Sequence, residues 1–227
     1  MIHEHGIGYI QEVNEKGEIV ILARLPNLER AIDRQYNEVE VIFQDGRRIT
    51  PRQRRAVFAI IGEIAEFVEG FKNAETIEST KEMLKMQFIL ERLESMERRL
   101  FSLSNVDETT ASSFIDFLIQ FVIKHNIPTS FPLIEQAENV GKYIYACAVN
   151  RKCCVCGQAA DLHHVEGSRI GQGNDRNEVH HLGRECLPLC REHHTICHND
   201  EKAFMDKYHL EPVKIDDKIC RVYRLKK

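Results

Sequence analysis

Cysteines and histidines gather near the end of the chain, within fewer than fifty residues and at spacings that suit metal ions. Cys153 and Cys156 form one pair with two residues between them, and Cys190 and His193 form a second pair at the same spacing. Two such pairs supply the four sulfur and nitrogen ligands of a tetrahedral zinc site. The spacing therefore predicts a structural zinc ion.

Further histidines of the same stretch stand outside those pairs. His194 and His198 are four residues apart, so on a helix both side chains face the same way. His163, from a preceding strand, would complete a three-histidine site with open coordination positions, as metal-assisted hydrolysis requires. His164 would lie on the opposite side of that strand's pleat, outside the ligand set, where it could act as a base.

The order of these motifs resembles the HNH, or ββα-metal, nuclease family in the variant that is braced by a structural zinc. The resemblance covers about residues 151–205 and rests on the first pair, on the two adjacent histidines and on the C-x-x-H-H-x-x-x-H run. It implies that His163, His194 and His198 bind a catalytic divalent cation and that His164 is the general base. The cation is Mg, Mn, Ni or Zn, because ligand type and affinity order alone do not choose among them.

Two features leave alternatives open. Glu185 stands where the family usually has its central Asn, and His181 is a candidate to support the loop in place of that Asn or to add a ligand. Cys154 or Cys186 is the alternative ligand if the register of a pair differs by one residue. A third alternative treats the whole module as a zinc-stapled binding unit whose extra histidines are polar surface.

The nuclease interpretation carries a mechanism. Histidine is the side chain best suited to proton transfer at physiological pH, and His164 would take a proton from the attacking water. The cation would stabilise the charge that builds on the scissile phosphate and on the leaving 3′ oxygen. Residues 167–176 form a Gly-rich loop in which Arg169 and Arg176 either grip a neighbouring phosphate or belong to an ordinary surface loop. The resemblance implies products with 5′ phosphates.

Composition restricts the class of protein. The chain has 227 residues, of which 43% are hydrophobic and 29% charged, as in globular proteins, and its net charge is −4. Seven of the eight cysteines follow residue 150 and the N-terminus lacks the apolar core of a signal peptide, which predicts a cytoplasmic protein with reduced thiols. The apolar run at residues 114–123 is too short to cross a bilayer, so no membrane partner is expected.

The pattern along the chain predicts an α+β fold. A β-hairpin is expected at residues 8–13 and 18–25, around a Gly-containing turn, and another strand at 38–43 before the turn signal Asp45-Gly46. The C-terminal end is expected to form the zinc-braced ββα-metal module, a helix at 203–208 and a terminal hairpin at 212–215 and 219–225. We expect an N-terminal α+β domain over 1–150 and a nuclease domain over 151–227.

Helices are predicted between these ends. Thr50-Pro51 begins one that Gly70 ends, and its apolar stripe consists of Val57, Ile60, Ile61, Ile64 and Val68. The others are expected at 74–102, at 111–125, which is apolar nearly all round and therefore buried, and at 133–150. The second carries a short heptad-like seam that either packs inside the domain or forms a homodimer; its members are Met86, Ile89, Leu93, Met96 and Leu100.

Basic residues are spread unevenly. Residues 1–150 carry 17 basic and 23 acidic side chains, yet five arginines fall close together around the start of the first long helix: Arg47, Arg48, Arg52, Arg54 and Arg55. The backbone N–H groups of a helix N-terminus also favour phosphate. The cluster therefore indicates either a DNA contact or a solvated basic face.

A second resemblance bears on the biological role. A helical N-terminal region followed by a Cys-braced HNH module resembles nucleases encoded by bacteriophages of Gram-positive hosts, which sit among recombination and replication genes. Residues 50–55 and the helix that follows also resemble recombination mediator proteins of lambda-like phages. Together they imply a phage-encoded nuclease in the bacterial host cytoplasm that cuts duplex, single-stranded or branched DNA. The alternative is a non-catalytic DNA-binding or recombination-mediator protein with a structural zinc module.

Overall fold

The structure is a computed structural model that describes residues 7–24, 27–35, 41, 46–92, 100–170 and 179–227. Contacts between Cα atoms divide the chain into two compact units, Met1–Gln44 and Asp45–Lys227. The helices from residue 51 onward and the metal-ligand-rich end therefore share one unit. The functional division at residue 150 stays a prediction.

The first unit contains the expected hairpin. Strand β1 (Ile7–Val13) pairs antiparallel with β2 (Ile19–Arg24), with a register shift between Ile10 and Glu12. The turn closes because Gly17 adopts a φ of 80° and the Asn14 side chain accepts hydrogen bonds from two backbone N–H groups. A short helix that the sequence did not predict, α1 (Leu28–Asp33), follows. The predicted strand at 38–43 lies outside the described residues except for position 41.

The second unit begins with helix α2 (Pro51–Glu69), whose bounds match the prediction. Thr50 and Gln53 form a reciprocal capping box at its start, and Gly70 ends it with a φ of 80°. Four residues of the predicted stripe are buried, but the side chain of Val68 is 56% exposed. The stripe therefore ends one turn before the helix does.

Helix α3 (Ala74–Glu91) is shorter than predicted. Arg92 is its C-cap, and Phe101 and Ser102, which the prediction placed in the same helix, are not helical. Of the heptad-like seam, Ile89 is 8% exposed and packs in the chain's own core, whereas Leu93 and Met96 lie outside the described residues. The homodimer stays a prediction.

Helix α4 (Glu108–His125) begins three residues earlier than predicted, because the Asp107 side chain caps it by accepting a hydrogen bond from Thr110 N. It is buried as expected and packs against α2 and α3. Phe88 and Phe114 meet edge to face in this core, with ring centroids 5.2 Å apart.

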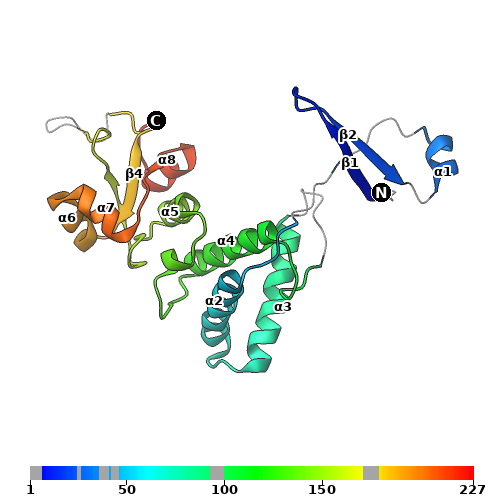
Figure 1. Cartoon of the computed structure of the whole chain (residues 1–227). Helices are drawn as coiled ribbons and strands as arrows, with labels where there is room; N and C mark the ends of the chain where they lie inside the picture. The colour runs from blue at the N-terminus through cyan, green and yellow to red at the C-terminus, as the bar shows by residue number, and fades with distance from the viewer. Residues whose placement is uncertain (1–6, 25–26, 36–40, 42–45, 93–99, 171–178) are drawn as a thin grey trace. The chain divides into compact units, whose positions relative to one another are not determined.

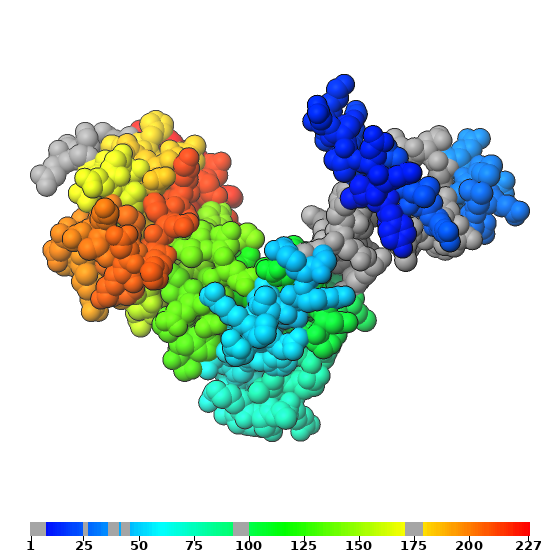
Figure 2. Space-filling view, in the orientation of Figure 1, coloured from blue at the N-terminus to red at the C-terminus, as the bar shows by residue number. Residues whose placement is uncertain are grey.

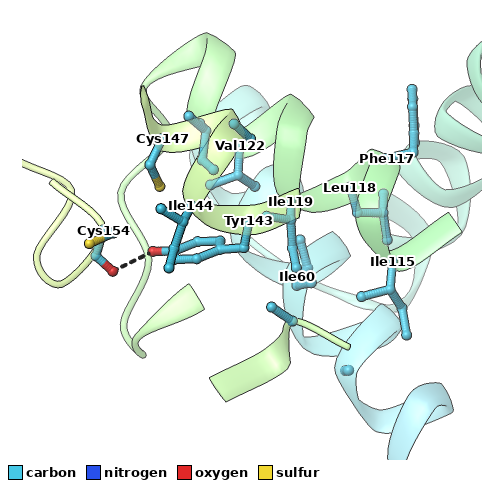
Figure 3. Packing of buried hydrophobic residues seen from close by; sticks show 14 of the residues in the cluster. Ile60, Ile115, Phe117, Leu118, Ile119, Val122, Tyr143, Ile144, Cys147 and Cys154 are labelled. Carbon is cyan, nitrogen blue, oxygen red and sulfur yellow. Dashed lines mark hydrogen bonds between the residues drawn. The ribbon is translucent and has the colours of Figure 1, made fainter. Parts of the chain in front are cut away.

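Helix α5 connects the helical core to the C-terminal module. The predicted single helix at 133–150 is wrong: a 3₁₀ turn, η1 (Leu133–Gln136), precedes α5 (Val140–Val149), and Asn139 caps the latter. α5 contacts α4 on one side and β4, β5 and α8 on the other. Tyr143 OH donates a hydrogen bond of 2.9 Å to the carbonyl of Cys154, which ties α5 to the cysteine-rich segment (Figure 3).

The C-terminal module contains the expected ββα order. Strand β3 (Asp161–His164) pairs antiparallel with β4 (Glu185–Leu189), and α6 (Arg191–Asn199) follows β4 directly. Helix α7 (Glu201–Tyr208) and strand β5 (Val213–Lys214) come next, and β5 completes a sheet of order β3-β4-β5 (Figure 1). The fold is α+β.

The predicted terminal hairpin is wrong. Residues 217–223 form helix α8 (Asp217–Tyr223), which begins because the Asp216 side chain accepts from Ile219 N. Ile219 and Cys220 face inward and, with Leu162 and Cys186, form a small second core beside β3 and β4. In Figure 2 the green segment that includes α5 lies directly against the yellow-to-red C-terminal segments. Within the described residues, no helix is long and apolar enough to cross a membrane.

Candidate metal centre

The predicted structural ligands come together. Cys153, Cys156, Cys190 and His193 each offer a ligand atom, and these atoms lie within 4.8 Å of one another. Zinc–sulfur bonds of about 2.3 Å in a tetrahedron place two sulfurs roughly 3.8 Å apart. The sulfurs of Cys156 and Cys190 are 3.7 Å apart, and the Cys153 sulfur is 3.6 Å from Nδ1 of His193. The donor set and its spacing fit a zinc ion.

Local structure explains why these four residues meet. Cys190 is the N-cap residue of α6 and His193 lies in its first turn, while Cys153 and Cys156 lie in the tight segment after α5. The alternative ligands lie elsewhere. Cys154 is buried and its carbonyl accepts from Tyr143, and Cys186 packs in the second core. Among the described residues, neither belongs to a group of potential metal ligands.

The predicted catalytic ligands also come together. His163 on β3 and His194 and His198 on α6 offer ring nitrogens that lie within 4.8 Å of one another. Their ring centroids are 4.6 to 4.9 Å apart. His163 is 1% exposed, His194 is half-buried and His198 is exposed. The group therefore opens from the interior toward solvent, where a substrate has access.

The electrostatics of this group suit a cation. Burial and then the neighbouring imidazoles of His163 and His198 lower the pKa of His194 to about 4. Burial also lowers the pKa of His163, although Glu201 opposes the shift. Both rings are therefore neutral near pH 7, which is the form of imidazole that binds metals.

Glu201, at the start of α7, is a member of the site that the sequence analysis missed. Its Oε2 lies 2.9 Å from His163 Nε2 and accepts from Arg169 at 3.0 Å, while Oε1 accepts from the backbone N–H of Glu166 at 2.7 Å. Its position three residues after His198 and one after the helix cap Asp200 was the available signal. It also forms a second potential ligand group with His163 and Cys197.

The second ring nitrogen of His163 tests whether a cation fits. Nδ1 of His163 is buried and has no hydrogen-bond partner among the described residues. A buried polar atom without a partner costs about 1–3 kcal/mol. A metal ion bound by Nδ1 would remove that cost, so the residues present fit a cation at the three histidines. By contrast, burial and then Glu201 raise the pKa of the Cys197 thiol to about 11, which makes it a poorer ligand.

His164 does not belong to the three-histidine group and contacts another histidine. It is half-buried, and its Nε2 lies 3.0 Å from Nδ1 of His181. His181 is fully buried, and its backbone N–H donates to the carbonyl of Lys226. His181 thus lies where it can orient the His164 ring. Glu185, which stands at the position of the family's Asn, begins strand β4.

The structure describes only one of the two arginines of the Gly-rich loop. Arg169 contacts Glu201, and its side chain remains 49% exposed. Arg176 lies outside the described residues. Arg184, which the sequence did not single out, donates to the carbonyls of Ser168 and His180. It therefore links the start of the Gly-rich loop with a residue that follows the loop.

Most of the arginines near the start of α2 bind the chain itself. Arg47 pairs with Glu108 at 3.1 Å and Arg48 donates to the carbonyl of Asn105. Arg54 donates to two carbonyls of the segment before α4, those of residues 103 and 104. Arg52 makes one long hydrogen bond of 3.4 Å to a carbonyl, and Arg55 is exposed. The last two therefore remain the candidates for an external contact.

Comparisons with known proteins identify the family of this chain. A family model described as "Putative HNHc nuclease" matches residues 26–226. The chain is also similar to "Uncharacterized protein YdfU" of Escherichia coli (strain K12), with 36% identity over 93 residues. That segment is 40% of this chain and 26% of the relative, so the chain spans about a quarter of the relative's length. No solved structure matches the chain.

Proposed function

Because the chain belongs to the HNHc nuclease family, whose model matches residues 26–226, we propose that it is a metal-dependent DNA endonuclease. One observation carries the proposal. His163, His194 and His198 converge within 4.8 Å at the junction of β3 and α6, and His164 follows on the same strand without belonging to the group. Three ligands with an open side and a separate base are what metal-assisted hydrolysis of a phosphodiester needs.

Each residue of the site has a role in this proposal. His163, His194 and His198 would hold the cation, which supplies charge stabilisation at the scissile phosphate. His164 accepts a proton from the attacking water as the water oxygen forms a bond to phosphorus. The bond from phosphorus to the 3′ oxygen breaks, and that oxygen takes a proton from solvent. The products are then a 5′ phosphate and a 3′ hydroxyl.

His181 supports the base in this scheme. A histidine transfers protons in a defined direction only when its ring is held in place, commonly through one of its two nitrogens. The contact between His164 Nε2 and His181 Nδ1 provides such a hold. His181 would therefore orient the base, beyond the loop support for which the sequence made it a candidate.

The four-ligand group has a separate role. We infer that Cys153, Cys156, Cys190 and His193 bind a structural zinc ion, since four ligands fill a tetrahedral shell and leave no position for water. Cys190 and His193 lie at the start of the helix that carries two of the site histidines. Zinc binding would thus fix that helix.

The substrate is proposed to be DNA in a recombination or replication intermediate, and the protein to be phage-encoded and to act in the bacterial cytoplasm. The resemblance to phage nucleases supports this role. The family match also extends over α2 to α5, which supports a helical region that serves the nuclease. Within that region, Arg52 and Arg55 are proposed to contact the DNA backbone, because the other clustered arginines already bind the chain.

A cleavage assay with defined substrates tests the function. Purified protein is treated with a chelator to empty the weaker site and then incubated with single-stranded, duplex, forked and four-way DNA across Mg²⁺, Mn²⁺, Ni²⁺ and Zn²⁺. We expect cleavage that depends on the added cation and leaves 5′ phosphates, together with two metal ions per chain. No cleavage under any cation, with one tightly held zinc per chain, would instead identify a non-catalytic DNA-binding protein.

A further inference from the structure

We propose that Glu201 is a positioning residue whose single carboxylate holds both the metal ligand His163 and Arg169, the candidate contact for a DNA phosphate. The proposal rests on the proposed function, because it assigns the cation to the three histidines. It adds a carboxylate from α7, an element outside the ββα unit that carries those histidines. Glu201 would act through His163, without touching the cation or the DNA.

The environment of Glu201 is that of an ionised and fully engaged carboxylate. The residue is 8% exposed, and its two oxygens contact His163, Arg169 and the backbone N–H of Glu166. Donation from the Arg169 guanidinium and from a backbone N–H to the same carboxylate favours its ionised, accepting form. A buried charge that is paired and hydrogen-bonded in this way is held in one geometry.

An ionised carboxylate decides which nitrogen of His163 carries the hydrogen. A carboxylate only accepts, so the 2.9 Å contact requires that His163 Nε2 donates to Glu201 Oε2. The lone pair is then on Nδ1, the buried nitrogen that lacks a partner among the described residues. Metal-binding histidines usually donate their other N–H to a carboxylate or carbonyl, which fixes the tautomer and makes the ring a better ligand. Glu201 stands in that relation to His163.

Arg169 shares the same oxygen. Its NH2 group donates to Oε2 of Glu201 at 3.0 Å, while 49% of its side chain remains exposed. A guanidinium has five N–H donors, so one contact with Glu201 leaves donors available for a phosphate. Glu201 therefore positions the arginine beside the metal ligand and leaves it able to bind DNA.

Metal affinity at the three-histidine site tests the proposal without requiring DNA cleavage. Full-length protein that keeps its structural zinc is titrated with Co²⁺, and binding is followed by the visible absorption of the bound ion. We expect Glu201→Gln to weaken Co²⁺ binding by roughly 10- to 100-fold, the usual effect of removing such a partner of a metal-binding histidine. Glu192→Gln, which removes an exposed glutamate from the first turn of α6, is the matched control and should leave Co²⁺ affinity unchanged.

Three further variants separate positioning from other roles. Arg169→Ala should keep Co²⁺ affinity and weaken DNA binding, because the contact from His163 to Glu201 remains. If the cation instead binds at His163, Cys197 and Glu201, Cys197→Ser will abolish Co²⁺ binding and His194→Asn will preserve it, and that result overturns the proposal.

The remaining readouts exclude a purely structural role. Zinc content and circular dichroism establish whether Glu201→Gln is folded; if it is not, Glu201→Asp replaces it, with the same weakening expected. ¹⁵N signals of the His163 ring should show the hydrogen on Nε2 in the parent protein and a mixture of tautomers in Glu201→Gln.

A folded variant with unchanged Co²⁺ affinity and an unchanged tautomer would reduce Glu201 to an anchor of the loop. An inactive parent protein would overturn the nuclease function and leave the affinity test standing.

Discussion

The two groups of metal ligands take residues from the same helix but differ in completeness and in surroundings. Cys190 and His193 at the start of α6 belong to a group of four, with spacings that match a closed tetrahedron. His194 and His198, on the same helix, belong to a group of three that runs from a buried to an exposed ring. Ligand number thus distinguishes the proposed structural zinc site from the proposed catalytic site.

The side chains around the two groups of metal ligands also differ. Around the four-ligand group, the contacts that tie it to the core include the hydrogen bond from Tyr143 to the carbonyl of Cys154 and the packing of His193 against Phe204. Around the three-histidine group lie ionisable side chains: Glu201, Arg169 and His164, the last held by His181. Charged and titratable residues are costly to bury, and their accumulation at one place is typical of a functional site.

The largest expected effect comes from breaking the closed group. Replacing Cys190 or Cys156 by Ala should unfold the C-terminal module, because zinc binding energy, about 10–16 kcal/mol in zinc-finger peptides, is folding energy in so small a unit. Zinc content and amide NMR signals measure the result. Cys220→Ala, a buried cysteine outside both groups, should keep zinc and fold. A folded and active Cys190→Ala protein that still binds its zinc would show that the ligand assignment is wrong.

Replacing the proposed base should stop DNA cleavage at the three-histidine group without loss of either metal ion. His164→Ala is expected to reduce the DNA cleavage rate by at least about 100-fold, the lower range for loss of a general base. Metal analysis should still find both ions, because His164 belongs to neither ligand group. His180→Ala, which alters an exposed neighbour, should cleave normally. Normal cleavage by His164→Ala would rule out its assignment as the base.

The pH dependence of stability should sharpen the contrast between the groups. The pKa of His194 is lowered from 6.5 to about 4, so between these values the unfolded chain binds a proton that the folded chain does not. The titration of His194 therefore costs no stability above pH 6.5, and it lowers the free energy of unfolding progressively as the pH falls toward 4. We expect protein without a cation at the three histidines to lose melting temperature more steeply over this interval than His194→Asn. If the melting temperatures of the two proteins fall in parallel as the pH is lowered, the lowered pKa of His194 is contradicted.

The smallest effect is expected outside both groups. Replacing Arg52 and Arg55 together by Ala should weaken DNA binding similarly for all sequences and reduce the slope of log affinity against log salt by roughly one per lost contact. Arg54→Ala is the matched control: its guanidinium already binds backbone carbonyls, so it should lower stability and leave the slope unchanged. An unchanged slope in the double variant would assign both arginines to a solvated face.

Much of the molecule follows from local sequence. The N-cap at Thr50 and the glycine at position 70 mark both ends of α2, and the turn around Gly17 sets the hairpin. These signals are local because they depend on the conformations that a few residues can adopt. The metal-ligand spacings were informative for the same reason. Two short pairs and two histidines on one helix face restrict geometry before any tertiary contact forms.

Tertiary structure decided the rest. The apolar residues near the C-terminus fit a strand as well as a helix, and burial of Ile219 and Cys220 against the sheet selected the helix. The contacts of Glu201 and His181 depend on α7 and a long loop returning to β3, separations of 38 and 17 residues. The sequence by itself determined the two sets of spaced Cys and His ligands and both ends of α2. Only the fold decided which carboxylate and which imidazole lie against them, because such contacts depend on packing between distant segments.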